Sequence, residues 1–248
     1  MFEYEEKDGI IILTLAHGKA SAMDLELMEA LDRTVDELHT RNARAVVLTG
    51  RGSIFSAGVD LFRVVNEGEP YLRRFLPALN RGLERFFKLD IPVVAACNGH
   101  AIAGGCLLVQ SCDYRLMAAG NGKIGVPELL VGVPFPTSAF EILRFVVPPN
   151  RLQEVALTGR TYTAPDALER GLIDEIAAPE MLMERALSVA TQMAAIPSAS
   201  FAATKRLARR DAVARFGSAD EAINAIWSRT ETIDTIRTYL DKTVGPRK

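Results

Sequence analysis

The sequence predicts a mixed α/β fold that is followed by a purely helical region. Short apolar runs typical of buried strands alternate with helical patterns along residues 1–180, whereas residues 181–248 carry helical patterns only. Two of the apolar runs end in glycine-bearing turns that lead into helices. We therefore expect a core over 1–180 and a C-terminal helical region over 181–248, packed on the core or on a neighbouring subunit.

The first predicted elements are a hairpin and a helix. Residues 2–16 form two strand-like runs separated by Asp8-Gly9, a dipeptide typical of a tight hairpin turn. Residues 21–40 then place apolar side chains at helical spacing. Ser21 and Asp24, three residues apart, have the spacing of a capping pair at the start of a helix. We therefore expect an amphipathic helix that begins at Ser21.

Three further apolar runs, at 43–50, 91–99 and 113–120, indicate buried strands. Residues 161–177 predict a helix started by Thr163 and Pro165, stopped at Gly171 and followed by a strand. From Glu180 onward the patterns are helical, and the longest is a continuous one over 218–242. The order of these elements supports an α/β core with helices at its C-terminal end.

The composition narrows the classes of protein that this chain represents. Its 248 residues are 48% hydrophobic and 24% charged, which is enough for a sizeable core. A net charge of −2 and the lack of a long apolar run lead us to expect no nucleic-acid partner and no membrane association. The three cysteines lack the spacing of a zinc site or redox pair, so we expect no metal and a reducing, cytoplasmic location.

Gly58, Gly104 and Gly105 lie in turns that connect a buried strand to a helix. Backbone N–H groups at such turns have no acceptor within the helix, and the helix dipole adds partial positive charge. Two such turns on neighbouring parallel strands can direct two amides at one oxygen, forming an oxyanion hole that glycine leaves open to a ligand. The alternative is that these glycines only permit tight strand-to-helix packing.

Glu128 is the nearest candidate acid or base downstream of these turns. Its apolar neighbours would raise the pKa of its carboxyl group toward the range useful for a general base. The alternative is structural, because Pro127-Glu128 is also a favoured way to begin a helix. His100 is either a packed, hydrogen-bonded group or a second acid-base residue. We interpret the basic segment 202–211 as a solvated helix face, with Lys205 or Arg206 as alternative contacts for a ligand phosphate.

Four segments of the chain together resemble the enoyl-CoA hydratase/isomerase family, also called the crotonase family. FSAGVDL (55–61) is similar to its first oxyanion motif and NGHAIAGGCLLVQSCDYR (98–115) to its second. IGVPELLVG (124–132) is similar to its catalytic segment, and LTGRTYTAPDALERGLIDEI (157–176) to the block that follows. Their order and spacing make the resemblance specific, and it covers most of the chain.

The resemblance implies a crotonase-like spiral of repeated ββα units with a C-terminal helical region that forms homotrimers or dimers of trimers. It also implies an acyl-CoA thioester as substrate, in lipid or fatty acid metabolism, with no cofactor beyond the coenzyme A of the substrate. The amides of Val59 and Gly104 would hold the thioester oxygen, and Glu128 would be the catalytic residue. Further residues would contact coenzyme A: Ser56, Ala57, Gly58 and Asp60 in the first oxyanion motif, and Lys19 and Ala20 in an early turn.

Leu107 departs from the pattern of the family's hydratases. Those enzymes carry two glutamates that position and deprotonate a water, and Leu107 stands where the first would be. A leucine there offers the water no hydrogen bond and makes the wall apolar. We therefore expect a single-base isomerase that converts 3-enoyl-CoA to 2-enoyl-CoA, with segment 62–89 shaping its acyl pocket.

Three other functions stay open at this stage. A hydratase or acyl-CoA hydrolase would use a water held by Glu128 and another group, such as His100. An acyl-CoA-binding protein without activity would bind thioesters and leave them unchanged. A nucleotide-binding α/β protein is the most distant alternative, because neither glycine turn matches a phosphate loop or a complete dinucleotide motif.

Overall fold

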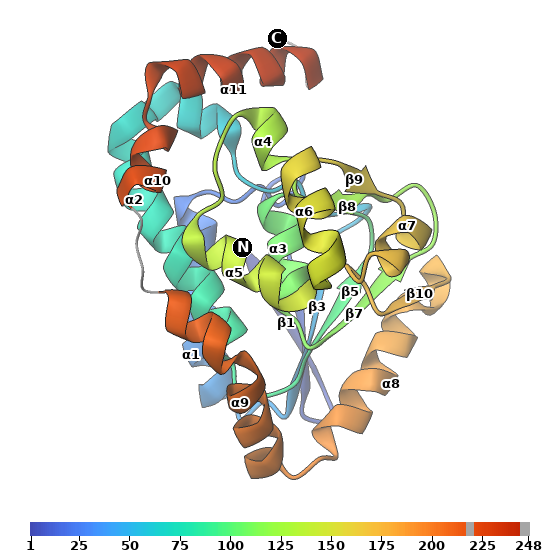
Figure 1. Ribbon diagram of the computed structural model, residues 1–248. Helices are drawn as coiled ribbons and strands as arrows, with labels where there is room; N and C mark the ends of the chain where they lie inside the picture. The colour runs from blue at the N-terminus through green and yellow to red at the C-terminus, as the bar shows by residue number, and fades with distance from the viewer. Residues whose placement is uncertain (217–220, 244–248) are drawn as a thin grey trace.

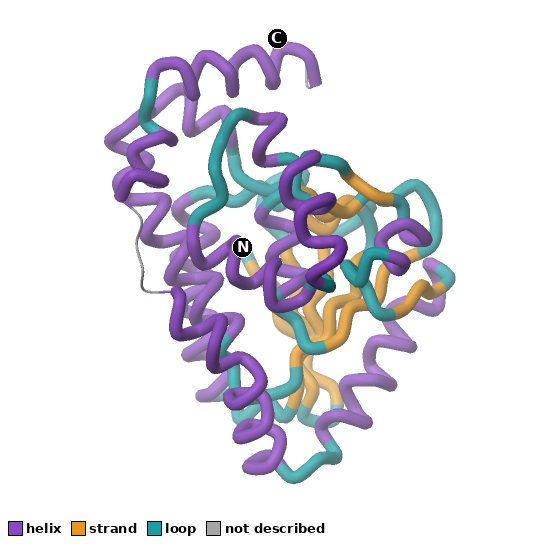
Figure 2. Tube along the Cα trace, in the orientation of Figure 1, coloured by secondary structure: helices purple, strands orange, loops and turns teal. Residues whose placement is uncertain are grey.

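The computed structural model describes residues 1–216 and 221–243, which form two β-sheets surrounded by helices (Figures 1 and 2). The larger sheet has the order β1-β2-β3-β5-β7-β10, with strands Phe2–Lys7, Ile10–Leu15, Ala45–Gly50, Val93–Cys97, Tyr114–Ala118 and Glu175–Ala177. The smaller sheet has the order β4-β6-β8-β9, with strands Ile54–Ser56, His100–Ile102, Ile124–Gly125 and Thr161–Tyr162.

A unit of two strands and a helix occurs three times along the chain. The strands β3, β5 and β7 lie side by side and parallel in the larger sheet, and each is followed by β4, β6 or β8 in the smaller sheet. Each short strand then leads into a helix: α2 (Leu61–Phe87), α3 (Gly104–Gln110) or α4 (Glu128–Val131). Because the short strands are parallel, the starts of these helices meet at one edge of the smaller sheet. The predicted α/β core with strand, turn and helix in sequence is confirmed.

The N-terminal hairpin is confirmed, but the start of the first helix is not. Asp8 and Gly9 both have positive φ angles, 52° and 75°, as a two-residue hairpin turn requires. Helix α1 runs over Leu25–Thr40, and its cap is Asp24, whose carboxylate accepts a hydrogen bond from the Leu27 amide at 2.8 Å. Ser21 lies outside the helix with a φ of 44°. The predicted cap at Ser21 is wrong because the carboxylate of Asp24 reaches the third helical amide itself.

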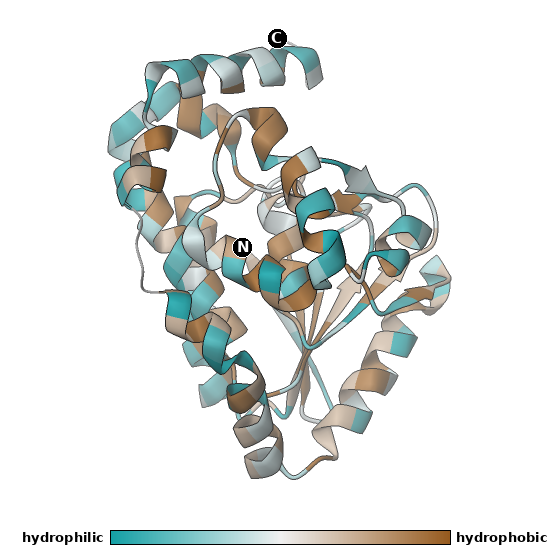
Figure 3. Ribbon diagram, in the orientation of Figure 1, coloured by the Kyte–Doolittle hydropathy of each residue, from teal (hydrophilic) through white to brown (hydrophobic). Residues whose placement is uncertain are grey.

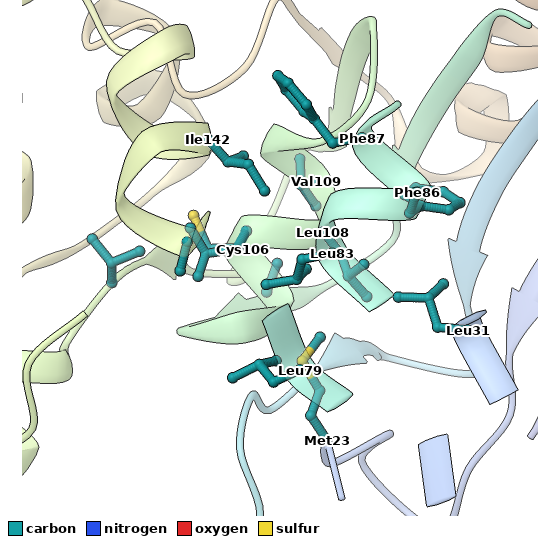
Figure 4. Packing of buried hydrophobic residues seen from close by; sticks show 14 of the residues in the cluster. Met23, Leu31, Leu79, Leu83, Phe86, Phe87, Cys106, Leu108, Val109 and Ile142 are labelled. Atoms are coloured by element: carbon teal, nitrogen blue, oxygen red, sulfur yellow. The ribbon is translucent and has the colours of Figure 1, made fainter. Parts of the chain in front are cut away.

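Both faces of the larger sheet are buried. Val46 and Leu48 of β3 join the main core with α1, α2, α3 and α5 (Thr137–Val146). Figure 4 shows part of this packing, in which Leu83, Phe87 and Ile142 gather around α3. The intervening residues of β3 pack instead against α8 (Leu182–Ala194) on the other face. Burial on both faces explains why the central strands read as continuous apolar runs, which appear brown in Figure 3.

The helices between the core strands and the C-terminal region agree with the sequence pattern. Helix α6 spans Pro149–Thr158, and α7 spans Ala164–Glu169 with Thr163 at its N-cap, as predicted. Gly171 follows α7 with a φ of 72° and the chain then enters β10. A short 3-10 turn, η1 (Pro179–Met181), precedes α8.

The C-terminal residues that the structure describes are helical, as predicted, but the last helical pattern is interrupted. Helix α9 spans Ser198–Phe216, α10 spans Glu221–Trp227 and α11 spans Thr230–Thr243. The expected continuous helix over 218–242 is therefore two helices, and its first three residues lie outside the described part of the chain. Trp227, the last residue of α10, is buried, and its indole Nε1 donates to the Pro134 carbonyl at 3.1 Å. Beyond the break, α11 packs against α2 and α4 (Figure 1).

The basic segment of α9 is not a fully solvated face. The side chains of Lys205 and Arg209 are each 5% exposed and contact Asp113 at 2.6 and 2.7 Å. Asp113 also accepts a hydrogen bond from the amide of Val93, so the three charges join α9 to the central strands. The prediction was wrong for these two cations because a carboxylate from another part of the chain compensates their burial. Arg206, by contrast, is 66% exposed.

In the described ranges, no single helix is long and apolar enough to cross a membrane. Two successive helical segments, Pro179–Ala194 and Ser198–Phe216, are together long and apolar enough, but the chain bends by 102° between them.

Candidate active site

A cavity of about 80 Å³ lies where α2, α3, α4 and α11 meet. Its wall is mostly apolar, and the two predicted oxyanion turns and Glu128 all reach it. The lining residues are Ala57, Val59, Leu61, Leu79, Ile102, Ala103, Gly104, Leu107, Pro127, Glu128, Val131, Val133, Pro136, Ala139, Trp227 and Tyr239. Segments far apart in the sequence therefore form one site.

Glu128 is the first residue of α4 and is 7% exposed. Its Oε2 atom is buried and has no hydrogen-bond partner among residues 1–216 and 221–243. Burial raises the pKa of Glu128 to about 8, because the charged carboxylate loses its hydration. Pro127 immediately precedes α4, so Glu128 also begins a helix. This agrees with the structural role that the sequence offered as the alternative. A carboxyl group in this setting can exchange a proton near neutral pH.

Val59 and Gly104, the residues predicted to supply the oxyanion amides, both line the cavity. Met23 forms a parallel bridge at Val59, but its hydrogen bonds run to the Gly58 carbonyl and from the Asp60 amide, which leaves the Val59 amide free. Gly104 is the first residue of α3, so its amide has no acceptor in the helix. Among the described residues, neither amide has a hydrogen-bond acceptor.

The two turns pack directly on one another. A Cβ atom at Gly58 would lie 2.5 Å from the Ile102 carbonyl oxygen, 2.8 Å from the Ala103 Cβ and 3.3 Å from the Gly104 amide nitrogen. Ala103, just before α3, has a φ of 51°, a strained value for a residue other than glycine. The absence of a side chain at Gly58 therefore brings the amides of Val59 and Gly104 together.

The residues predicted to contact coenzyme A have different surroundings. Ala57 lines the cavity, and its amide donates to the Ala20 carbonyl at 2.9 Å, which joins the early turn to the first oxyanion motif. Lys19, in that turn, is exposed. Ser56 is fully buried, and its Oγ donates to the Ser21 carbonyl at 2.7 Å. The carboxylate of Asp60 caps α2 by accepting from two amides at 3.0 and 3.2 Å.

Leu107 and His100 have contrasting positions. Leu107 is 3% exposed and lines the cavity with Glu128. His100 is exposed, and its Nδ1 accepts a hydrogen bond from the Lys123 amide at 3.2 Å. Since the cavity is not lined by His100, the structure favours the hydrogen-bonded packing role for it over acid-base work.

Trp227 and Tyr239, which come from α10 and α11, are among the cavity residues that the sequence did not predict. In the sequence, each is an aromatic residue within a helical pattern near the end of the chain. Such a pattern does not indicate where the helix packs. The predicted pocket segment 62–89 does supply Leu79 to the wall. Within the described ranges, no group of three His, Cys, Asp or Glu side chains is arranged to hold a metal ion.

These groups support one kind of chemistry. Two convergent amides can stabilise negative charge on a carbonyl oxygen, and a carboxylate in an apolar wall can remove a proton from a carbon next to that carbonyl. Leu107 offers a nucleophilic water no hydrogen bond, and of the lining side chains only Glu128, Trp227 and Tyr239 carry polar atoms.

Comparison with known proteins places these features among one group of enzymes. The sequence family described as enoyl-CoA hydratase/isomerase matches residues 5–235. A carnitinyl-CoA dehydratase of Salmonella typhi is 33% identical over 204 residues, covering 81% of this chain and 77% of that protein. The mitochondrial enoyl-CoA delta isomerase 1 of Rattus norvegicus is 27% identical over 250 residues, covering 98% and 86%.

A solved structure described as a Mycobacterium tuberculosis enoyl-CoA isomerase is also similar to this chain, and another structure of that same protein is described as a probable enoyl-CoA hydratase. The first superposes with a TM-score of 0.83 at 32% identity, covering 90% of this chain and 97% of that one. The predicted crotonase-like fold is thereby confirmed.

Proposed function

Since the chain belongs to the enoyl-CoA hydratase/isomerase family, we propose that it converts 3-enoyl-CoA thioesters to 2-enoyl-CoA thioesters with Glu128 as a single base. The observation that carries this proposal is the apolar wall around Glu128, to which Leu107 contributes. A shift of a double bond needs one base that moves a proton, whereas hydration needs a water that is held and deprotonated.

In the proposed reaction, the thioester oxygen accepts hydrogen bonds from the Val59 and Gly104 amides. Glu128 removes a proton from C2, and the electron pair spreads over the thioester and the C3–C4 double bond. The same carboxyl group returns the proton to C4, so the double bond ends between C2 and C3. Amides that hold the oxygen of such an enolate typically contribute a factor on the order of 100 to 1000 each.

Hydration or dehydration is the second candidate, because the Salmonella typhi relative is a carnitinyl-CoA dehydratase. This reaction also starts from an enoyl or hydroxyacyl thioester and would use the same amides and Glu128. It requires a second polar group to bind the water. Leu107 does not supply one, and Tyr239 is the lining side chain that would have to do so.

The test is turnover of the purified protein on 3-hexenoyl-CoA and on crotonyl-CoA. We expect isomerisation of the first and little hydration of the second. Glu128→Gln should lower isomerisation by a factor on the order of 100 to 10,000. Glu141→Gln is the matched control, since Glu141 is also buried but does not line the cavity. Rapid hydration of crotonyl-CoA by the unaltered protein would contradict the isomerase proposal.

A further inference from the structure

Tyr239, on α11, lines the described cavity wall with a phenol hydroxyl. The proposed proton transfer does not use this hydroxyl, and no other described residue forms a hydrogen bond with it. Three of the lining side chains have polar atoms, and two are engaged: Glu128 as the proposed base, and Trp227 through its bond to the Pro134 carbonyl. The backbone carbonyl of Tyr239 accepts a hydrogen bond from the Thr243 hydroxyl. Its phenol hydroxyl has no partner among the described residues.

The hydroxyl of Tyr239 is available as a donor. Burial and the nearby charge of Glu128 both raise the pKa of Tyr239, so the phenol keeps its proton at neutral pH. The buried Oε2 atom of Glu128 also has no partner, so the two groups do not satisfy each other. A half-buried phenol normally finds an acceptor, and here the cavity is the place where a ligand can offer one.

Tyr239 and Glu128 reach the cavity from different helices. Glu128 begins α4, whereas Tyr239 projects from α11, which covers α4 on the side away from the sheets (Figure 1). The remaining wall is apolar, so an oxygen on the acyl chain would be buried without a hydrogen bond unless it reached this phenol.

We infer that Tyr239 recognises an uncharged oxygen on the acyl chain, so that the preferred thioesters carry a keto or hydroxyl group beyond the reacting carbons. This inference rests on the proposed function for the placement of those carbons. The donor is neutral, and the apolar wall offers no cation to compensate the burial of an acyl carboxylate. One neutral hydrogen bond corresponds to roughly a 3- to 10-fold gain in affinity.

The experiment measures binding of saturated thioesters, in which no reaction takes place. Octanoyl-CoA and its 5-, 6- and 7-oxo derivatives are titrated calorimetrically into the full chain. We expect one oxo isomer to bind roughly 3- to 10-fold more tightly than octanoyl-CoA, and the other isomers to bind no better. Tyr239→Phe should abolish this preference. Tyr162→Phe is the control, because the Tyr162 hydroxyl also lacks a partner but lies outside the cavity lining, and it should keep the preference.

Two results would overturn the inference. One is that no oxo isomer binds more tightly than octanoyl-CoA. The other is that Tyr239→Phe keeps the preference or weakens all four thioesters by the same factor, since the phenol would then not read the oxygen. Turnover of 3-hexenoyl-CoA is measured separately, so failure of the isomerase proposal is distinguishable from failure of this one.

Discussion

Leu107 on α3 and Glu128 at the start of α4 line the same cavity, and both are almost fully buried. A leucine beside the proposed base keeps the wall apolar and raises the cost of ionising the carboxyl group. This pair therefore affects both the reaction that the site favours and the pH at which its base is charged.

Leu107→Glu should introduce hydration of crotonyl-CoA. A second carboxylate can hold a water near Glu128, and we expect the ratio of hydration to isomerisation to rise at least about tenfold. Turnover of both thioesters measures this ratio. Leu107→Gln has a similar size without a base, so it should show a smaller rise. A ratio in Leu107→Glu that equals that of the unaltered protein would mean that Leu107 is not what disfavours hydration.

The pH dependence of kcat/KM should follow the ionisation of Glu128. Because burial raises the pKa of this group to about 8, the free protein is mostly protonated at pH 7 and lacks its base. We expect kcat/KM on 3-hexenoyl-CoA to rise with pH and to level off above about pH 8. Initial rates measured from pH 6 to 9 test this, and a flat profile would contradict a base with a raised pKa.

Glu128→Gln should change how stability depends on pH. The unfolded chain ionises Glu128 near its usual pKa of 4.5, whereas the folded chain keeps the proton to about pH 8. Between these values the unfolded state binds fewer protons, so the free energy of unfolding falls as the pH rises, by up to about 5 kcal/mol. Urea unfolding at pH 5 and pH 8 should show this loss in the unaltered protein and a smaller one in the variant.

Gly58→Ala should damage the site more than Gly52→Ala. Both glycines have positive φ angles, 81° and 69°, so both substitutions strain the backbone by about 1–2 kcal/mol. At Gly58 the new Cβ would also lie 2.5 Å from the Ile102 carbonyl, whereas at Gly52 nothing lies within 4 Å. We expect kcat/KM to fall on the order of 100-fold for Gly58→Ala only. Similar losses in both variants would assign the effect to strain alone.

Asp113→Ala should destabilise the fold strongly. The substitution leaves Lys205 and Arg209 buried without their counter-charge, and such a loss typically costs about 3–5 kcal/mol. Asp211→Ala is a suitable control, because its side chain is 77% exposed and pairs with Arg210 at the surface. Urea denaturation compares the two variants, and a loss below about 1 kcal/mol for Asp113→Ala would show that the buried charges find other partners.

Local patterns predicted much of the fold because short-range rules govern those elements. Asp8-Gly9 forms the expected turn, Thr163 begins α7, and the core strands lie where continuous apolar runs indicated. One failure was local, since Asp24 rather than Ser21 caps α1. Another depended on a distant contact, since Lys205 and Arg209 of the basic segment are buried against Asp113.

By itself, the sequence determined the family, the order of the elements and the residues that could supply a base and two free amides. Glycine positions, apolar runs and caps act over a few residues, so they can be recognised in the letters. Only the tertiary structure decided that Gly58 lies against Gly104, that Leu107 shares a cavity with Glu128 and that Tyr239 completes its wall. Those relationships depend on how helices dock on the sheets, which the sum of many weak, long-range packing contacts determines.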